Sequence, residues 1–212
     1  MRERPILLNA EMVRAVLNGS KTQTRRIMSP QPADDIRSHV FPNKEIQGWL
    51  SSLKHEHGPT TAHSCPFGQP GDRLWVREKT LCLSTNNGKA HIRYLADNAP
   101  RTVDIPSRLK PVTPGKCLSN GCYREASRIT LEITGVRVER LQAISEADAA
   151  AKGVPPAGGL LPDYPGTYLT PKGDFATAKV AFQRLWESIY KPASWQANPW
   201  CWVIEFKRVE NV

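Results

Sequence analysis

The segment after Gly19 concentrates groups that can bind an anion or exchange a proton. Residues 20–26, with the sequence SKTQTRR, contain three cations and three hydroxyls and no acid. Hydroxyls and Lys or Arg side chains are the usual protein contacts to phosphate and sugar. The side chains of an extended segment alternate, which groups Thr22, Thr24 and Arg26 on one face and Lys21, Gln23 and Arg25 on the other. The alternative is a solvated basic turn.

A second candidate surface lies at Trp75, Arg77 and Glu78. Alternation in residues 73–77 puts Leu74 and Val76 on one face, and Trp75 with its neighbouring arginines on the other. An aromatic ring flanked by arginines can stack on a base and hold its phosphate. In the alternative interpretation, Trp75 is a half-buried residue of the sheet.

Four residues have side chains suited to a structural zinc ion. They are His63, Cys65, Cys117 and Cys122, and the spacing of the last two falls within the range of zinc knuckles. His63 and Cys65 are unusually close together, and thiols without metal are common in cytosolic proteins. We therefore expect no metal and no other cofactor, with zinc as the alternative.

Composition sets the class of protein. The 212 residues carry 29 Lys and Arg against 20 Asp and Glu, a formal net charge of +9, and such an excess attracts polyanions such as nucleic acid. No apolar run is long enough for a membrane helix, and the first residues do not form a signal peptide. The odd number of cysteines, five, is typical of reduced thiols. We predict a cytoplasmic protein with no membrane partner.

Periodicity and capping residues predict three helices. The first covers residues 9–19 with Asn9 as N-cap, the second 145–152 with Ser145 as N-cap, and the third begins at Asp174. Strands are expected at residues 73–77, 91–95, 127–141 and 200–209. The remainder forms loop insertions at about 28–70, 98–123 and 155–172, the first with a short helix near 44–53. The pattern predicts a single α+β domain over residues 1–212, a small barrel flanked by helices.

The order of these motifs resembles the ASCH domain family, small barrels similar to the PUA domains of RNA-modifying proteins. The longer string resembles the larger ASCH proteins of bacterial prophages. The residues that carry the resemblance are Gly19, Lys21, Thr22 and Arg26, then 71–78, 129–138, 144–146, 195–200 and 203–206.

The resemblance implies RNA or modified-nucleoside binding beside Lys21. It further implies hydrolysis of the acyl group of N4-acetylcytidine by a threonine, a lysine and a glutamate. By motif position these are Thr24 as nucleophile, Lys21 as base and a residue at 152, where this chain has Lys152. Glu146 and Asp148 are expected to face elsewhere, so Glu78 is the substitute carboxylate. The substrate-binding residues are Thr22, Arg25, Arg26, Trp75 and Arg77.

Three functions remain open at this point. The chain is an amidohydrolase, a ribonuclease or an RNA-binding regulatory module without turnover. The lysine at position 152 distinguishes the amidohydrolase from the binding module. A charged lysine there does not accept a proton and repels Lys21. The sequence predicts neither the ligand's identity nor the oligomeric state.

Overall fold

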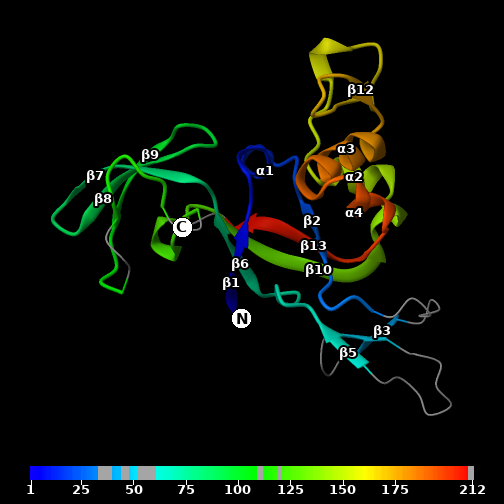
Figure 1. The fold of residues 1–212 in the computed structure, drawn as a ribbon, viewed down its shortest axis with the longest axis horizontal. Helices are drawn as coiled ribbons and strands as arrows, with labels where there is room; N and C mark the ends of the chain where they lie inside the picture. Colours follow the sequence, from blue (N-terminus) through cyan, green and yellow to red (C-terminus); the bar gives the residue numbers. More distant parts are fainter. Residues whose placement is uncertain (33–39, 44–47, 52–60, 109–111, 119–120, 210–212) are drawn as a thin grey trace. The chain divides into compact units, whose positions relative to one another are not determined.

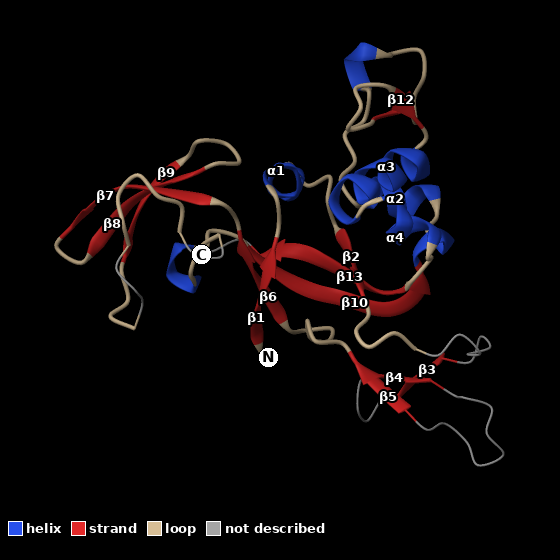
Figure 2. Cartoon of the chain, viewed as in Figure 1, coloured by secondary structure: helices blue, strands red, loops and turns tan. Residues whose placement is uncertain are grey.

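The computed structural model describes residues 1–32, 40–43, 48–51, 61–108, 112–118 and 121–209 (Figures 1 and 2). The chain divides into two compact units that alternate along the sequence. The first unit comprises Met1–Gly19, Gly71–Glu132 and Lys207–Val212, and the second comprises Ser20–Pro70 and Ile133–Phe206. Helices and mixed sheets together confirm the α+β class.

The first unit is built on strands β1 (Glu3–Leu7), β6 (Arg73–Arg77) and the start of β10 (Thr130–Arg140). β1 pairs in parallel with β6, and β6 pairs antiparallel with β10. The predicted alternation of β6 is confirmed, since Leu74 and Val76 are buried and the other three residues of the strand are half-buried. Helix α1 (Ala10–Leu17) follows β1, and the side chain of Asn9 accepts a hydrogen bond from the backbone of Met12, as expected for its N-cap.

A second sheet of the first unit was only partly predicted. Strands β7 (Thr80–Asn86), β8 (Lys89–Tyr94) and β9 (Pro100–Asp104) pair antiparallel. Only β8 was expected, and β9 lies within a predicted loop. The turn between β7 and β8 has positive φ angles at Asn87 and Gly88. This is the signature of a two-residue hairpin, and the Asn-Gly pair was a signal for it in the sequence.

The second unit contains β2 (Gln23–Ile27), most of β10 and most of β13 (Trp200–Val209), the last with its predicted bounds. Figure 1 shows β10 and β13 as long neighbouring strands, and the sheet has the linear order β1-β6-β10-β13-β2. Helices α2 (Glu146–Ala151), α3 (Ala178–Tyr190) and α4 (Pro192–Gln196) form a group in this unit (Figure 2). Their apolar core includes Phe182, Trp186 and Trp195.

Two predicted helix positions were wrong. α3 begins after Thr177, whose hydroxyl accepts a hydrogen bond from the backbone of Val180, rather than after Asp174. Phe175 belongs instead to β12 (Phe175–Ala176), which pairs with β11 (Tyr168–Leu169). Part of the helix expected at 44–53 is strand β4 (Gly48–Ser51), and the rest of that prediction lies outside the described residues.

The two predicted insertions of the second unit also contain regular structure. β4 pairs with β3 (Val40–Asn43) and β5 (Thr61–Ser64) in a small antiparallel sheet. The segment 155–172 contains β11 and a short 3-10 helix at Gly158–Leu160. Among the described residues, no helix has the length and apolar character that a membrane crossing requires.

Candidate functional site

Lys21 lies just before β2 in the second unit, opposite Lys152 in an isolated antiparallel bridge. It is only 4% exposed, so the basic segment is not a solvated turn. Its Nζ donates to the backbone oxygens of Gln23 and Lys152, both at 2.9 Å. Burial, together with the nearby charge of Arg26, lowers the pKa of Lys21 from 10.5 to about 7. Two N–H groups of Nζ therefore donate to carbonyl oxygens. The remaining site on the nitrogen carries a third proton in the ammonium ion and a lone pair in the neutral amine.

Gln23 and Arg25 point from β2 toward helix α2. The Nε2 of Gln23 donates to Asp148 Oδ1 at 3.0 Å, and the Nη2 of Arg25 donates to Asp148 Oδ2 at 3.1 Å. The same Nη2 is 2.6 Å from Glu139 Oε2. The prediction that Gln23 and Arg25 share a face is therefore confirmed. The expectation that Asp148 faces elsewhere was wrong, because residues four apart on a helix lie on one side and Asp148 precedes Lys152 by four.

Arg137 joins three carboxylates on the same face. Its guanidinium donates to Glu139, to Asp148 at 2.7 Å and to Glu205. Burial opposes ionisation of Asp148, but the hydrogen bond from Gln23 and the charges of Arg137 and Arg25 hold its pKa below the usual range. We call this set the charged cluster; its members are Gln23, Arg25, Arg137, Glu139, Asp148 and Glu205.

The charged cluster has a buried side and an accessible side. The side chain of Arg25 is fully buried, whereas those of Asp148, Glu139 and Glu205 are 24%, 26% and 44% exposed. Within the described residues, Nε and Nη1 of Arg25 and Oε1 of Gln23 have no hydrogen-bond partner. Such groups are normally satisfied by water or a ligand. The accessible carboxylates are therefore the part of this cluster that a ligand meets first.

The other residues of the segment have different environments. Thr24 is buried within β2 and pairs with Ile204 of β13. Alternation places Thr24 and Arg26 on the face opposite Arg25; Arg26 is half-buried and Thr22 is exposed. In the described structure, no hydrogen bond joins Thr24 to Lys21.

Lys152 ends helix α2 and is also 4% exposed. Its Nζ lies 5.5 Å from the centre of the Phe182 ring. Burial and the charges of Lys21, Arg25 and Arg26 hold its pKa well below the ordinary value. Lys152 is therefore a buried lysine, paired with Lys21 in the backbone bridge, rather than an exposed surface residue.

The second predicted surface belongs to the first unit. Trp75 is half-buried and packs against the apolar cluster around Tyr94, in agreement with the alternative interpretation of Trp75 as a residue of the sheet. Arg77 is half-buried on the same strand. Glu78 is 1% exposed and both of its oxygens accept hydrogen bonds from Arg128, at 2.8 and 2.9 Å. Glu78 is thus held in an ion pair within its own unit.

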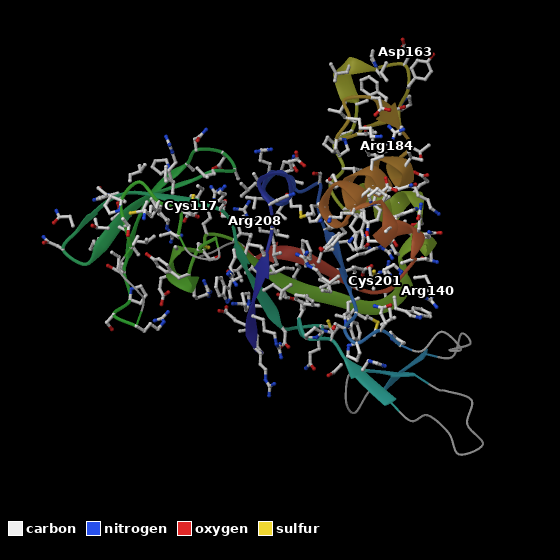
Figure 3. The ribbon with its side chains drawn as sticks, in the orientation of Figure 1. Cys117, Arg140, Asp163, Arg184, Cys201 and Arg208 are labelled. Atoms are coloured by element: carbon white, nitrogen blue, oxygen red, sulfur yellow. The ribbon has the colours of Figure 1, made fainter. Side chains whose placement is uncertain are left out.

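The zinc candidates are divided between the units. His63 and Cys65 belong to the second, and Cys117 and Cys122 to the first. Cys117, labelled in Figure 3, is exposed. The thiol of buried Cys122 contacts the backbone oxygen of Val76 at 3.6 Å. Among the described residues, no group of three His, Cys, Asp or Glu side chains is arranged to hold a metal ion.

Sequence reasoning did not identify most of the charged cluster. The period of β10 places Arg137 and Glu139 on one face, and this was a usable signal.

Trp200 contacts the last residue of β10, Arg140. The Arg140 guanidinium lies 4.5 Å from the centre of the Trp200 ring, and Figure 3 labels Arg140 and Cys201. Trp186 and Trp202 are buried, as expected for core residues.

Comparison with known proteins leaves the function to be argued from this geometry. No family model, curated protein or solved structure matches the chain.

Proposed function

We propose that this chain is an ASCH-like protein with a PUA-like barrel, which binds a modified cytidine beside Lys21 and hydrolyses its N4-acyl group. The observation that supports this most is the state of Lys21, a buried amine held by two carbonyl oxygens with a pKa of about 7. A lysine in this condition is available as a general base at neutral pH. Perturbed groups of this kind are concentrated at functional sites.

The charged cluster supplies groups suited to the ligand. Carboxylates accept hydrogen bonds from the exocyclic nitrogen of cytosine, and a guanidinium donates to the ring nitrogen and to the carbonyl oxygen. Glu139, Asp148 and Arg137 offer both kinds of group at partly exposed positions. The cluster therefore suits a base edge that carries donors and acceptors side by side.

In the proposed reaction, Lys21 takes a proton from the attacking group and later gives it to the leaving nitrogen. The neutral amine removes a proton from the attacking hydroxyl, and the oxygen bonds to the acyl carbon. The C–N bond then breaks, and the Lys21 ammonium returns the proton to the departing N4. If Thr24 is the nucleophile, as the resemblance implies, an acyl-threonine forms and water hydrolyses it with the same base. If water attacks directly, Thr24 has no covalent role.

The test is deacetylation of N4-acetylcytidine by the native protein and by Lys21→Met, Thr24→Val and Lys172→Met. Lys172 is an exposed lysine of the same unit and serves as the control. We expect turnover that rises with pH through about 7, is abolished in Lys21→Met and is unchanged in Lys172→Met. Loss in Thr24→Val identifies the threonine as nucleophile, and retained turnover identifies water. Native protein that binds the nucleoside without turnover would refute the hydrolase.

A second candidate, an RNA-binding module, is favoured by the distribution of charge. The first unit has 16 Lys and Arg against 9 Asp and Glu, or +7, and the second has 13 against 11, or +2. Counterion release makes RNA affinity depend on such an excess. Arg25 is bound by carboxylates in the interior, so the backbone contacts of RNA are better sought among exposed cations of the first unit.

Charge reversal separates the contributions of the two units. Lys79→Glu with Lys116→Glu changes two exposed lysines of the first unit, and Lys172→Glu with Lys191→Glu is the matched pair in the second. We expect only the first pair to weaken binding of single-stranded RNA and to flatten its salt dependence, by ~0.7 in slope for each phosphate that the protein no longer neutralises. Equal effects of the two pairs would contradict this assignment.

A further inference from the structure

Two buried polar side chains of β2 are only partly satisfied. Gln23 and Arg25 are each 2% exposed. Among the described residues, Oε1 of Gln23 and both Nε and Nη1 of Arg25 have no hydrogen-bond partner. A buried polar group without a partner destabilises the fold, and two such residues on one strand indicate a shared missing partner. We call Gln23 and Arg25 the inner pair.

A single carboxylate fixes the position of the inner pair. The Nε2 of Gln23 lies 3.0 Å from Asp148 Oδ1, and the Nη2 of Arg25 lies 3.1 Å from Asp148 Oδ2. An ionised carboxylate only accepts hydrogen bonds, so it binds the amide NH₂ of Gln23 and leaves the carbonyl oxygen unpaired. It likewise binds one nitrogen of the Arg25 guanidinium and leaves the other two. The unpartnered acceptor and donors therefore belong to two groups that meet at one carboxylate.

A purely structural role explains the inner pair poorly. Arg137 already binds both Glu139 and Asp148, so a second, buried guanidinium is not needed to neutralise them. Burial of Arg25 has a desolvation cost that its unpaired N–H groups do not recover. The inner pair also lies beside the proposed base, because the Nζ of Lys21 donates to the backbone oxygen of Gln23 at 2.9 Å. The missing partner is therefore best sought in the ligand of the same site.

We propose that the inner pair recognises the Watson–Crick edge of the cytosine ring and so determines which base the site accepts. On that edge a donor, N4–H, lies next to an acceptor, N3. Gln23 Oε1 accepts from N4–H, which an N4-acyl group leaves in place, and an N–H group of Arg25 donates to N3. Uracil has the reverse order, an acceptor at O4 and a donor at N3, so both contacts would bring like groups together. The inference rests on the proposed function for the pyrimidine nucleoside.

The ligand approaches from solvent past Asp148. The side chain of Asp148 is 24% exposed, and it contacts both members of the inner pair. Arg137 binds Asp148 from the accessible side and is 30% exposed. Partly exposed side chains change rotamer readily, so Arg137 turns toward solvent as the ring enters. The partly exposed groups of the charged cluster meet the base first, and the inner pair then selects it.

The experiment is titration calorimetry of the native full chain with cytidine, uridine, N4,N4-dimethylcytidine and 3-deazacytidine. N4,N4-dimethylcytidine lacks the N4–H donor, and 3-deazacytidine lacks the N3 acceptor. We expect cytidine to bind about tenfold or more tightly than each of the other three, because every mismatch leaves a buried group unpaired. The changes are made in the ligand, so the fold of the protein is the same in all four titrations.

Gln23→Met tests the assignment of one contact. The variant removes the acceptor but keeps a side chain of similar length. Its preference for cytidine over N4,N4-dimethylcytidine should disappear, while its preference over 3-deazacytidine should remain. Gln196→Met, the same change at an exposed glutamine of the second unit, should keep both preferences. Affinity ratios that are the same in Gln23→Met as in native protein overturn the assignment to Gln23.

The outcomes separate this inference from the proposed function. Equal binding of cytidine and uridine by native protein overturns recognition by the inner pair and leaves nucleoside binding standing. The expected preference for cytidine, in a protein that does not deacetylate N4-acetylcytidine, supports the inference and refutes the hydrolase. Failure of all four nucleosides to bind overturns both.

Discussion

Replacement of Lys21 by methionine should change how protein stability depends on pH. The pKa of this lysine is about 7 in the folded chain and near 10.5 when exposed. Between these values the unfolded chain holds the proton and the folded chain does not, so stability rises with pH over this range. Each pH unit contributes about 1.4 kcal/mol, and the whole interval contributes about 5 kcal/mol. This stability is present above pH 10.5 and is lost as the pH falls to 7.

The assay is urea unfolding of the native protein and Lys21→Met at pH 7.5, 8.5 and 9.5. Lys152 and the other titrating groups remain in both proteins, so the difference between their unfolding free energies reports the titration of Lys21 together with the effect of its charge on the pKa of Lys152. We expect that difference to shift in favour of the native protein by about 1 kcal/mol or more for each pH unit. Lys172→Met, which removes an exposed lysine, should show no such trend. A native-minus-variant difference that is constant between pH 7.5 and 9.5 would refute the buried, near-neutral state of Lys21.

Three further substitutions test other contacts. A Cβ on Gly135 would lie 2.7 Å from Glu205 Oε2, so Gly135→Ala should cost about 1 kcal/mol in urea unfolding, and the cost should vanish in a Glu205→Ala background. Glu78→Gln should lower unfolding stability by about 2 kcal/mol because it weakens a buried pair with Arg128; deacetylation that stays unchanged in the folded variant would remove Glu78 from the reaction. Lys152→Glu places an acid beside the Lys21 amine and should move the pH dependence of deacetylation upward, whereas an unmoved profile would separate the two residues functionally.

The buried position of Arg25 affects the choice of variants. Arg25 is fully buried and binds two carboxylates, so its removal would leave a cavity, take one of two cationic partners from Glu139 and Asp148 and destabilise the second unit. An RNA-binding defect in an Arg25 variant would therefore report on folding as well as on binding. Variants of exposed lysines are the better probes of polyanion binding.

The local features of the fold were the part accessible to sequence reasoning. The N-caps Asn9 and Ser145 each accept a hydrogen bond from the backbone three residues later, and the bounds of β13 match the prediction. These features depend on residues close together in the chain, and the pattern of neighbours is enough to predict them. The Asn87-Gly88 hairpin was equally local, and its signal was overlooked.

Competition between local signals was decided by tertiary contacts. Asp174 and Thr177 are both suitable N-caps, but Asp174 hydrogen-bonds with Thr170 and Arg184, and Phe175 pairs with Leu169. The helix therefore begins at the later cap. Propensity alone ranks the two residues almost equally, so the choice depends on partners supplied by other segments.

The sequence by itself determined the α+β class, strands β6, β8, β10 and β13, helices α1 and α2, and the presence of a cationic segment at residues 21–26, but not strands β1 and β2 of the same sheet. Only the tertiary structure decided that Lys21 and Arg25 are buried, because their partners come from distant parts of the chain. Arg25 meets Glu139 across 114 positions, and Lys21 meets Lys152 across 131. The protonation of a lysine depends on the burial and charge around it, and these are set by how the sheet and α2 pack together.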